Sequence, residues 1–528
     1  MGFNQPIKPF KLAVLGSGPS AFYLTQRLLN QLPYNPNHAI HMYERLPVPF
    51  GLVRYGVAPD HPDVKNCVNS FSRAASDNRF KFYGGVSVGD STKNNDISLS
   101  LLAKHYTHLA FSYGASQPTH LRIPGSVGSS RRLRGVYSAA DLVGWYNGHP
   151  DYTHLHDSLS ADLSRARKVA IIGQGNVGLD IARVLLTTNR SAHALTHTDI
   201  PSSVLHSLQH ASIDHVDLVG RRGPAQVAFT AKETREMMHL PDVAMKSVGV
   251  GGGVSEASDA IHHAIMHGDQ HASNDREWRA KKRILNLLAD GSKCGMHDAA
   301  KTWGLRFLLS PTHFHSKQDK DHLTHISFAV NKLTETPPST SVVGGEPATQ
   351  TPARVLATPT AQTHEEEYDL AIESIGYRAH PLGNIPFDTS RGVIRNSGGR
   401  VIGEDGVNIP NVYSTGWASR GPVGVIASTM YDSYSVADTI VSDLHSDQVE
   451  GESGEDEAAG VSFTNASHLD WAPSTSPLPG VPPVVEHQAV KWSDWLRINQ
   501  AEIDNGKDHG KLREKFLTVD AMMGVLGR

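Results

Sequence analysis

The chain has 528 residues, 39% hydrophobic and 19% charged, a balance typical of a globular protein with two or three domains. Its net charge of -4, from 49 basic and 53 acidic residues, gives no general basic excess for binding nucleic acid. The two cysteines, Cys67 and Cys294, lie far apart, which excludes a disulfide-stapled fold, a redox-active cysteine pair and a cysteine-ligated iron–sulfur cluster on this chain. No window approaches the roughly 18 apolar residues of a membrane span.

The segment before Lys11 contains one basic side chain, Lys8, and no arginine. It is shorter and poorer in arginine than an ordinary cleavable mitochondrial presequence, and it has no apolar signal-peptide core. We therefore expect no obvious cleavable targeting segment.

The first predicted unit is strand, glycine-rich turn, helix, strand and acid, from Lys11 to Glu44. Gly16 permits a tight turn, Gly18 lets a pyrophosphate approach the backbone, and the helix N-terminus faces the phosphates. Glu44 ends the second strand, where a carboxylate can hold the ribose hydroxyls of an adenosine. The pattern predicts a dinucleotide site; the alternative is an ordinary strand-to-helix turn whose glycines serve only backbone geometry.

The next segments extend the first domain. Residues 47–62 are rich in Pro and Gly yet apolar, which predicts a loop that wraps a flat apolar cofactor ring. Residues 64–75 have a helical pattern, 80–89 predict a strand and turn, and 108–115 predict a strand that ends in a glycine turn. That turn is the expected exit from the first domain.

A second strand–turn–helix unit follows at residues 168–186, with the fingerprint Gly173-Gln174-Gly175-Asn176-Val177-Gly178. The next strand, 215–219, ends in Arg221 and Arg222, at the position that Glu44 holds in the first unit. Guanidinium groups pair with the extra phosphate of NADP, which a carboxylate would repel. The first site therefore suits FAD or NAD and the second NADP; for the arginine pair alone, the alternative is a solvated strand end.

Several longer motifs closely resemble the adrenodoxin reductase family of mitochondrial-type ferredoxin–NADP reductases. The resemblance runs from Leu12 to Leu526, and its motifs lie at residues 16–19, 48–62, 144–148, 173–177, 220–224, 303–307, 374–377, 416–426, 493–495 and 513–515. It implies an α/β fold of two Rossmann-like dinucleotide-binding domains, as in glutathione reductase. The FAD domain is discontinuous, over residues 1–114 and 374–528, and the NADP domain covers 115–373.

The resemblance also implies the cofactor contacts. Those to FAD fall at Gly16, Gly18, Ser20, Glu44, Leu52, Val88, Trp417, Gly424, Val425 and Ile426. Those to NADP(H) fall at Gln174, Gly175, Asn176, Val177, Arg221, Arg222 and Glu233, with Gly424 near the nicotinamide. Ser20 and Gly178 depart from the alanines usual in the family.

The return segment, residues 421–428, is expected to open a helix whose N-terminus stabilises the negative charge of a reduced flavin. Its Gly-Pro start also suits a generic helix entry.

The function implied is electron transfer from NADPH through FAD to a [2Fe–2S] ferredoxin, for iron–sulfur cluster, haem or cytochrome P450-type mitochondrial chemistry. His61 and Asp180 are candidates for a proton or charge relay. A loop histidine that bonds backbone explains His61 equally well, and an acid that complements the helix dipole explains Asp180. Arg279 and Arg283, four apart on a predicted helix, match the family's docking arginines for an acidic, adrenodoxin-like ferredoxin; the alternative is a solvated helix face.

Two other functions were weighed. An electron-input subunit of a glutamate-synthase-like complex would carry N-terminal cysteine clusters, which this chain lacks. A non-catalytic flavoprotein is disfavoured by the two intact fingerprints. The resemblance places the protein in the mitochondrion, with at most peripheral membrane association. Residues 191–212, 248–258, 335–366 and 443–484 are biased in composition and predict surface loops or linkers.

Overall fold

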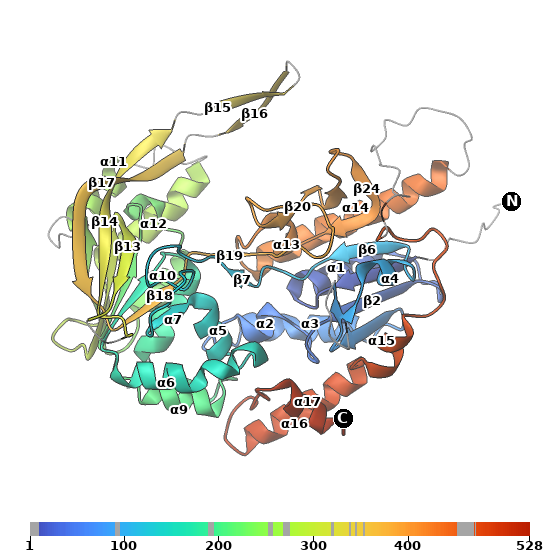
Figure 1. Cartoon of the computed structure of the whole chain (residues 1–528), viewed down its shortest axis with the longest axis horizontal. Coiled ribbons are helices and arrows are strands. Elements are labelled where there is room, and N and C mark those ends of the chain that lie inside the picture. The colour runs from blue at the N-terminus through green and yellow to red at the C-terminus, as the bar shows by residue number, and fades with distance from the viewer. Residues whose placement is uncertain are drawn as a thin grey trace. The chain divides into compact units, whose positions relative to one another are not determined.

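The computed structural model describes residues 10–89, 96–187, 195–251, 257–267, 275–317, 321–336, 339–343, 346–351, 354–450, 469 and 471–528. The chain folds into two compact units (Figure 1). Unit 1 comprises Met1–Val57, His61–Gln117 and Gly376–Arg528, and unit 2 comprises Ala58–Asp60 and Pro118–Ile375. The chain thus forms most of unit 2 as one continuous stretch between two parts of unit 1.

Unit 1 is built on a sheet with the strand order β22-β23-β24-β6-β1-β2-β3. The strands from β24 to β3 are parallel, with Leu12 beside both Ile40 and His108. Its strands are β1 Lys11–Leu15, β2 Ala39–Glu44, β3 Phe80–Gly84, β6 His108–Phe111, β22 Asn396–Ser397, β23 Arg400–Ile402 and β24 Asn408–Ser414. Short pairs are formed by β4 Ser87–Val88 with β5 Asp96–Ile97 and by β20 Phe387–Asp388 with β21 Val393–Ile394.

Helices cover this sheet because each presents an apolar stripe to it. On α1, Leu24 and Leu28 are fully buried, and α1 packs against α14. The helices are α1 Pro19–Gln31, α2 Leu52–Tyr55, α3 Cys67–Ala74, α4 Leu99–Ala103, α13 Trp417–Arg420, α14 Ile426–Glu450, α15 Pro483–Gln488, α16 Trp492–Lys507 and α17 Val519–Val525. Residues 64–75 are helical as predicted, and α2 adds one helical turn to the predicted loop at 47–62.

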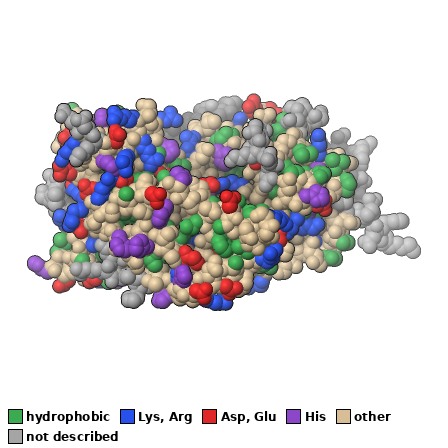
Figure 2. Space-filling model, turned by 60° about the horizontal axis from the view of Figure 1, so that its bottom comes forward, with side chains coloured by type: hydrophobic (Ala, Val, Ile, Leu, Met, Phe, Trp, Pro, Cys, Tyr) green, Lys and Arg blue, Asp and Glu red, His purple; other side chains and the backbone are tan. Residues whose placement is uncertain are grey.

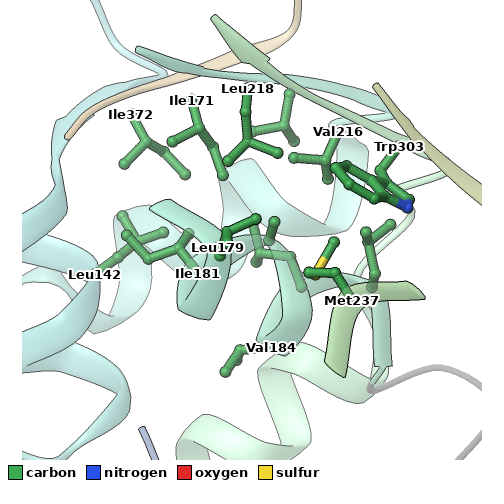
Figure 3. Packing of buried hydrophobic residues seen from close by; sticks show 14 of the residues in the cluster. Leu142, Ile171, Leu179, Ile181, Val184, Val216, Leu218, Met237, Trp303 and Ile372 are labelled. Atoms are coloured by element: carbon green, nitrogen blue, oxygen red, sulfur yellow. The ribbon is translucent and has the colours of Figure 1, made fainter. Parts of the chain in front are cut away.

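Unit 2 is built on a parallel sheet with the strand order β11-β12-β10-β9-β18-β8. Its strands are β8 Val136–Ser138, β9 Lys168–Ile172, β10 His215–Val219, β11 Val243–Val250, β12 Lys301–Phe307 and β18 Leu370–Glu373. Its helices are α5 Ala139–Tyr146, α6 His156–Arg165, α7 Asn176–Thr187, α9 Ser202–Gln209, α10 Ala231–Met238, α11 Ala257–His267 and α12 Asp275–Asp290. Leu179 and Ile181 of α7 pack toward Ile171 and Leu218 of the sheet, with Trp303 fully buried in the same core (Figure 3).

A second, antiparallel sheet in unit 2 has the order β13-β14-β17. It is formed by β13 Leu309–His315, β14 His325–Thr336 and β17 Arg354–Glu367, and a hairpin of β15 Ser339–Val343 and β16 Glu346–Thr351 lies between the last two in sequence. The prediction of loops at 335–366 is therefore wrong. The composition that suggested a linker is crowded with Thr and Pro, but the β-branched side chain of Thr also favours strands.

The loop prediction at 191–212 is wrong in part, because α9 occupies residues 202–209. Its face with Val204, Leu205 and Leu208 is buried in the core of unit 2. The biased stretch at 443–484 begins inside α14. The loop prediction at 248–258 is wrong at both ends, because β11 extends to Val250 and α11 begins at Ala257. Residues 191–194, 252–256, 337–338, 344–345, 352–353, 451–468 and 470 of these predictions lie outside the described residues.

Among the residues that the structure describes, no helix combines the length and the apolar character needed to cross a bilayer.

Candidate functional site

The first glycine turn joins β1 to α1 in unit 1. Gly16 has φ of 100°, and a Cβ built there would lie 2.6 Å from the Tyr113 Cα, so only glycine fits. A Cβ at Gly18 would meet nothing within 4 Å, which leaves open space beside its backbone. The α1 helix begins at Pro19, next to that space. This geometry suits a pyrophosphate that approaches the backbone at a helix N-terminus.

Glu44 lies at the end of β2, beside the glycine turn. Its Oε2 accepts hydrogen bonds from the Ser17 amide at 3.2 Å and from the Ser17 hydroxyl at 2.7 Å, and its Oε1 accepts one from the Leu46 amide at 3.1 Å. These bonds hold the carboxylate in place. Its remaining acceptor capacity can bind ribose hydroxyls.

The return segment after β24 meets the first turn. A Cβ on Gly416 would lie 2.6 Å from the Ser20 Cβ, so the two backbones approach closely, and the Gly416 amide donates to Asp432 Oδ2 at 2.6 Å. The predicted contact residues Trp417, Gly424, Val425 and Ile426 all follow on this segment. Unit 1 therefore brings Ser20 and the return segment together.

Two features of the return segment fit a flat aromatic cofactor. The Trp417 indole Nε1 is buried and has no hydrogen-bond partner in the described part of the chain. Val423 and Val425 are 66% and 51% exposed, unusual for adjacent large apolar side chains. Leu52 and Val88 are half-buried in the same unit. The donor and apolar groups present are those that FAD would use.

A buried ion pair joins the predicted flavin-wrapping segment to the C-terminal helix α16. The Arg54 Nη2 lies 2.5 Å from the Glu502 Oε1, and both side chains are at most 5% exposed. Glu502 also accepts from the Phe516 amide at 3.0 Å and from Arg513 at 3.3 Å, while Lys515 Nζ donates to the Arg54 carbonyl at 3.1 Å. Burial disfavours the charged guanidinium, but the Glu502 carboxylate outweighs it and raises the pKa of Arg54.

The second glycine turn joins β9 to α7 in unit 2. Gly173 has φ of 131°, and a Cβ there would overlap the Ser374 carbonyl at 2.0 Å, whereas a Cβ on Gly175 would meet nothing within 4 Å. The Gln174 side chain donates to the carbonyls of Leu218 and Arg306, both at 3.1 Å. Its amide is therefore used to fix the turn against the sheet.

The remainder of the turn is fixed by Asn176, whose Oδ1 accepts the Thr230 amide at 2.8 Å. Val177 is on the first turn of α7 and packs at the margin of the unit 2 core. The Gly175 backbone forms a bridge with Ala228, and space is open on the side where a Cβ would stand.

Arg221 and Arg222 follow β10 and are both exposed. Partial burial, and then the charge of the preceding Arg221, lower the pKa of Arg222. Within the part of the chain that the structure describes, no carboxylate forms an ion pair with either. Two neighbouring cations without an acidic partner suit a phosphate dianion.

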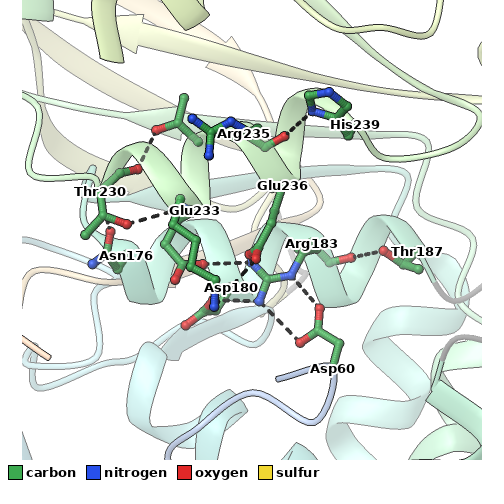
Figure 4. A network of polar contacts seen from close by, with 12 residues as sticks. Asp60, Asn176, Asp180, Arg183, Thr187, Thr230, Glu233, Arg235, Glu236 and His239 are labelled. Carbon is green, nitrogen blue, oxygen red and sulfur yellow. Dashed lines mark hydrogen bonds and ion pairs between the residues drawn. The ribbon is translucent and has the colours of Figure 1, made fainter. Parts of the chain in front are cut away.

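Arg183 of α7 is the centre of an acidic network in unit 2 (Figure 4). Its guanidinium pairs with both carboxylate oxygens of Asp60 and lies 2.7 Å from Asp180 and 3.1 Å from Glu233, with Glu236 at 3.6 Å. Burial opposes the charge on Arg183, but Asp60 and Asp180 raise its pKa. The structure thus brings together Asp180 and Glu233, two residues predicted for different roles.

His61, Arg279 and Arg283 are the remaining predicted site residues. His61 is a buried residue of unit 1, and its relay role stays a prediction. Arg279 and Arg283 lie on α12 as expected and are exposed, while Ile284, Leu285 and Leu288 of that helix are buried. The arginines therefore stand on the solvent side of an amphipathic helix, and their docking role stays a prediction.

The chain is similar over nearly its whole length to proteins of known function. No protein-family profile matches the chain. NADPH:adrenodoxin oxidoreductase from Bos taurus is 35% identical over 532 residues, which cover 98% of this chain and 92% of that protein. The Homo sapiens protein of the same name is 36% identical, with 99% and 94% covered. The chain belongs to the NADPH:adrenodoxin oxidoreductase family.

Solved structures agree with the NADPH:adrenodoxin oxidoreductase assignment. FprA of Mycobacterium tuberculosis, solved in complex with NADPH, superimposes with a TM-score of 0.74 at 32% identity and covers 98% of this chain and 99% of its own. The predicted α/β fold with two dinucleotide-binding domains is confirmed.

Sequence reasoning missed three ion pairs, those of Arg183 with Asp180 and with Asp60 and that of Arg54 with Glu502. Arg183 lies three residues after Asp180 on a helix, so their i,i+3 spacing could have indicated an ion pair. Asp60 is the one acid of the motif at 48–62, which is rich in Pro, Gly and apolar residues, and this was a signal for a buried partner. The Arg54–Glu502 pair joins residues 448 positions apart, and no local pattern indicates it.

Proposed function

We propose that the protein is a mitochondrial NADPH:ferredoxin oxidoreductase that holds FAD in unit 1 and NADPH in unit 2. The observation that carries the proposal is the contrast at the ends of two equivalent strands. Glu44 follows one glycine turn and accepts hydrogen bonds beside it, whereas Arg221 and Arg222 follow the other and have no carboxylate partner among the described residues. An acid favours free ribose hydroxyls and an arginine pair favours a 2′-phosphate.

FAD, when bound, supplies the ability to accept two electrons from a nicotinamide and to donate them singly to an iron–sulfur protein. The balance is one NADPH oxidised, two ferredoxins each reduced by one electron, and one proton released. The chain's own residues have to bind and orient the two coenzymes and to exclude water. No protein nucleophile is required.

In unit 1, Gly16 and Gly18 give the pyrophosphate access to the backbone, and Glu44 holds the adenosine ribose. Trp417 offers its unpaired indole N–H to the cofactor, and the exposed Val423 and Val425 are covered when the ring system binds. Leu52, Val88, Gly424 and Ile426 complete the proposed flavin contacts. The α14 helix begins at Ile426, so its N-terminal dipole favours added negative charge on a nearby ring.

In unit 2, the open backbone at Gly175 and the first turn of α7 receive the NADPH pyrophosphate. Arg221 and Arg222 bind the 2′-phosphate. Glu233 and Asp180 share Arg183, which fixes both carboxylates in position for the nicotinamide half of the coenzyme. We assign to Asp180, with His61 of unit 1, a role in moving protons or balancing charge during electron transfer.

The electron acceptor is proposed to be an acidic [2Fe–2S] ferredoxin of the adrenodoxin type, docked at Arg279 and Arg283. Both side chains are exposed on one face of α12, and complementary charge speeds the encounter of two proteins. Cationic side chains on a surface attract such a partner less as salt rises.

The function is tested by assaying cytochrome c reduction by NADPH with and without an adrenodoxin-type ferredoxin. We expect a yellow protein whose flavin absorbance bleaches with NADPH and whose cytochrome c reduction depends on the ferredoxin. A colourless protein that takes up no flavin would refute the proposal.

The docking site is tested by the double charge reversal Arg279→Glu and Arg283→Glu. The apparent KM for ferredoxin should rise at least about tenfold, because each lost charge pair at a docking interface costs on the order of 1 kcal/mol. Reduction of a small dye by NADPH should stay unchanged. Lys104→Glu, at an exposed lysine of unit 1, is the control for a general charge effect. An equal loss of dye reduction would show that the arginines do not form a docking site.

A further inference from the structure

The antiparallel sheet β13-β14-β17 of unit 2 has one apolar and one polar face. Phe314 and Ile326 point to the buried face and are at most 1% exposed. Because side chains alternate along a strand, the residues on either side of them lie on the other face. Directly opposite residues share a face, and His315 is opposite His325, as Ser327 is opposite Glu365. Three strands thus bring imidazoles and a carboxylate to the same patch.

The side chains of this patch are in mutual contact. The ring centroids of His315 and His325 are 4.3 Å apart, and those of His315 and His313 are 3.9 Å apart. The His315 Nε2 lies 2.7 Å from the Ser327 hydroxyl, which donates to the Glu365 Oε1 at 2.8 Å. This chain of hydrogen bonds holds the carboxylate on the histidine side of the sheet.

We propose that His315, His325 and Glu365 bind one divalent cation of the zinc class. One donor atom from each of the three lies within 4.8 Å of the other two. Imidazole nitrogens with a carboxylate oxygen are the donors that Zn²⁺ accepts, with His313 or water as a fourth ligand. The site lies outside both dinucleotide turns, so it is independent of the proposed redox function.

A modest adjustment closes the site. In a tetrahedral site, donor atoms about 2.0–2.1 Å from a common ion lie roughly 3.4 Å apart, so each pair of donor atoms, now within 4.8 Å, must close by at most about 1.4 Å, which is less than about 1 Å of movement per atom. The two rings are stacked within 3° of parallel, and one must turn so that both lone pairs meet at the ion. Rotation about χ2 of histidine is soft, and the side chains are partly exposed, so the backbone need not move.

The consequence of occupation is a cross-link between three strands, the last of which, β17, is separated in sequence from β13 and β14 by the hairpin β15–β16. Glu365 lies 38 residues after Ser327 and 50 after His315, and the ion would tie β17 to β13 through β14. A ligand that binds only the folded state raises the melting temperature of the unit that contains its site.

The test uses the flavin-loaded, full-length protein without an affinity tag, first treated with a chelator and then titrated with ZnCl₂ by calorimetry. The wild type is expected to bind one zinc ion with higher affinity than any other it takes up. The double variant His315→Ala and His325→Ala should lose that event, and Glu365→Gln should weaken it at least about tenfold, the usual effect of losing one support of a metal site.

The chain contains 30 histidines, and Figure 2 shows others on the surface, so a matched control is needed. His206 of α9 and His210, the residue after α9, also lie close together, with ring centroids 4.2 Å apart, and both are exposed. The double variant His206→Ala and His210→Ala should keep the tight event. Equal zinc binding by the wild type and by the His315→Ala and His325→Ala variant would overturn the proposal, as would loss of the tight event in the control.

Melting temperature supplies a second readout. Zinc should raise the melting temperature of unit 2 in the wild type, EDTA should reverse the rise, and Glu365→Gln should show a smaller rise. Since Glu365 is exposed, this variant is expected to fold normally. An identical zinc response in Glu365→Gln and the wild type would remove the carboxylate from the site and contradict the proposal.

Discussion

Replacing Glu502 with glutamine should destabilise unit 1 strongly and loosen the segment that we assign to the flavin. The carboxylate is fully buried and pairs with Arg54, which is itself 6% exposed. Glutamine keeps an oxygen for the Phe516 amide but leaves the guanidinium buried without a counter-charge. Removing one partner of a buried ion pair costs about 3–5 kcal/mol.

For a unit of this size, that loss lowers the melting temperature by roughly 6–20 °C. Because Arg54 lies on α2, within residues 47–62, the flavin should be released in the same transition. The measurement is thermal release of flavin fluorescence, compared with circular dichroism of the same sample.

Two companion variants separate the causes. Asp504→Asn breaks an exposed ion pair with Lys507 on the same helix, and its transition should match that of the wild type. Arg54→Met with Glu502→Gln removes the unpaired charge and should recover part of the lost stability. If Glu502→Gln melts within about 2 °C of the wild type, or if the double variant is no more stable than the single one, the buried pair does not hold this segment.

Four other substitutions test the sites. Arg222→Ala should raise the KM for NADPH by about 10- to 150-fold, the value of one charge-assisted hydrogen bond, and leave the KM for NADH unchanged in steady-state assays. Gly175→Val should raise the KM for both coenzymes, because its side chain fills the space left open beside the backbone; unaltered kinetics would place the pyrophosphate elsewhere. Glu44→Gln should weaken FAD binding to the apoprotein at least about tenfold in a fluorescence titration, and equal affinity would contradict the ribose contact. Burial lowers the pKa of His108 to about 3. Below about pH 6.5 the unfolded chain binds a proton at this histidine that the folded state does not bind, so the free energy of unfolding falls as the pH falls. Urea unfolding measures this effect. Between pH 7 and pH 5, the free energy of unfolding should fall by about 2 kcal/mol less in His108→Leu than in the wild type.

The fold class and the strands next to the turns could be predicted from the sequence because their signals are local. The strand at Lys11–Leu15 and the strand at Lys168–Ile172 begin where the two predicted units begin, since each is a short apolar run that ends at a glycine. The exposed placement of Arg279 and Arg283 also follows from local spacing, because their helix has one apolar face.

Other features could not be predicted. Some depend on partners far away in the sequence, and others depend on a composition that is found both in linkers and in strands. Nothing near Glu502 indicates Arg54, and nothing near Asp60 names Arg183 as its partner. The Thr-rich stretch at 335–366 was predicted to be a linker because of its composition, yet threonine favours strands once a neighbouring strand is available. The zinc-class patch needed the register of three strands before its donors could be grouped.

The discontinuity of unit 1 has a consequence for synthesis on the ribosome. Strand β24 pairs with β6, with Val412 opposite Leu109. Residues 118–375 leave the ribosome after β6 and before β24. Unit 2 can therefore finish folding before β24 is available to pair with β6 in the sheet of unit 1. Flavin uptake should therefore be a late event, after the final helices have left the exit tunnel, and a stalled nascent chain would be expected to bind pyridine nucleotide before it turns yellow.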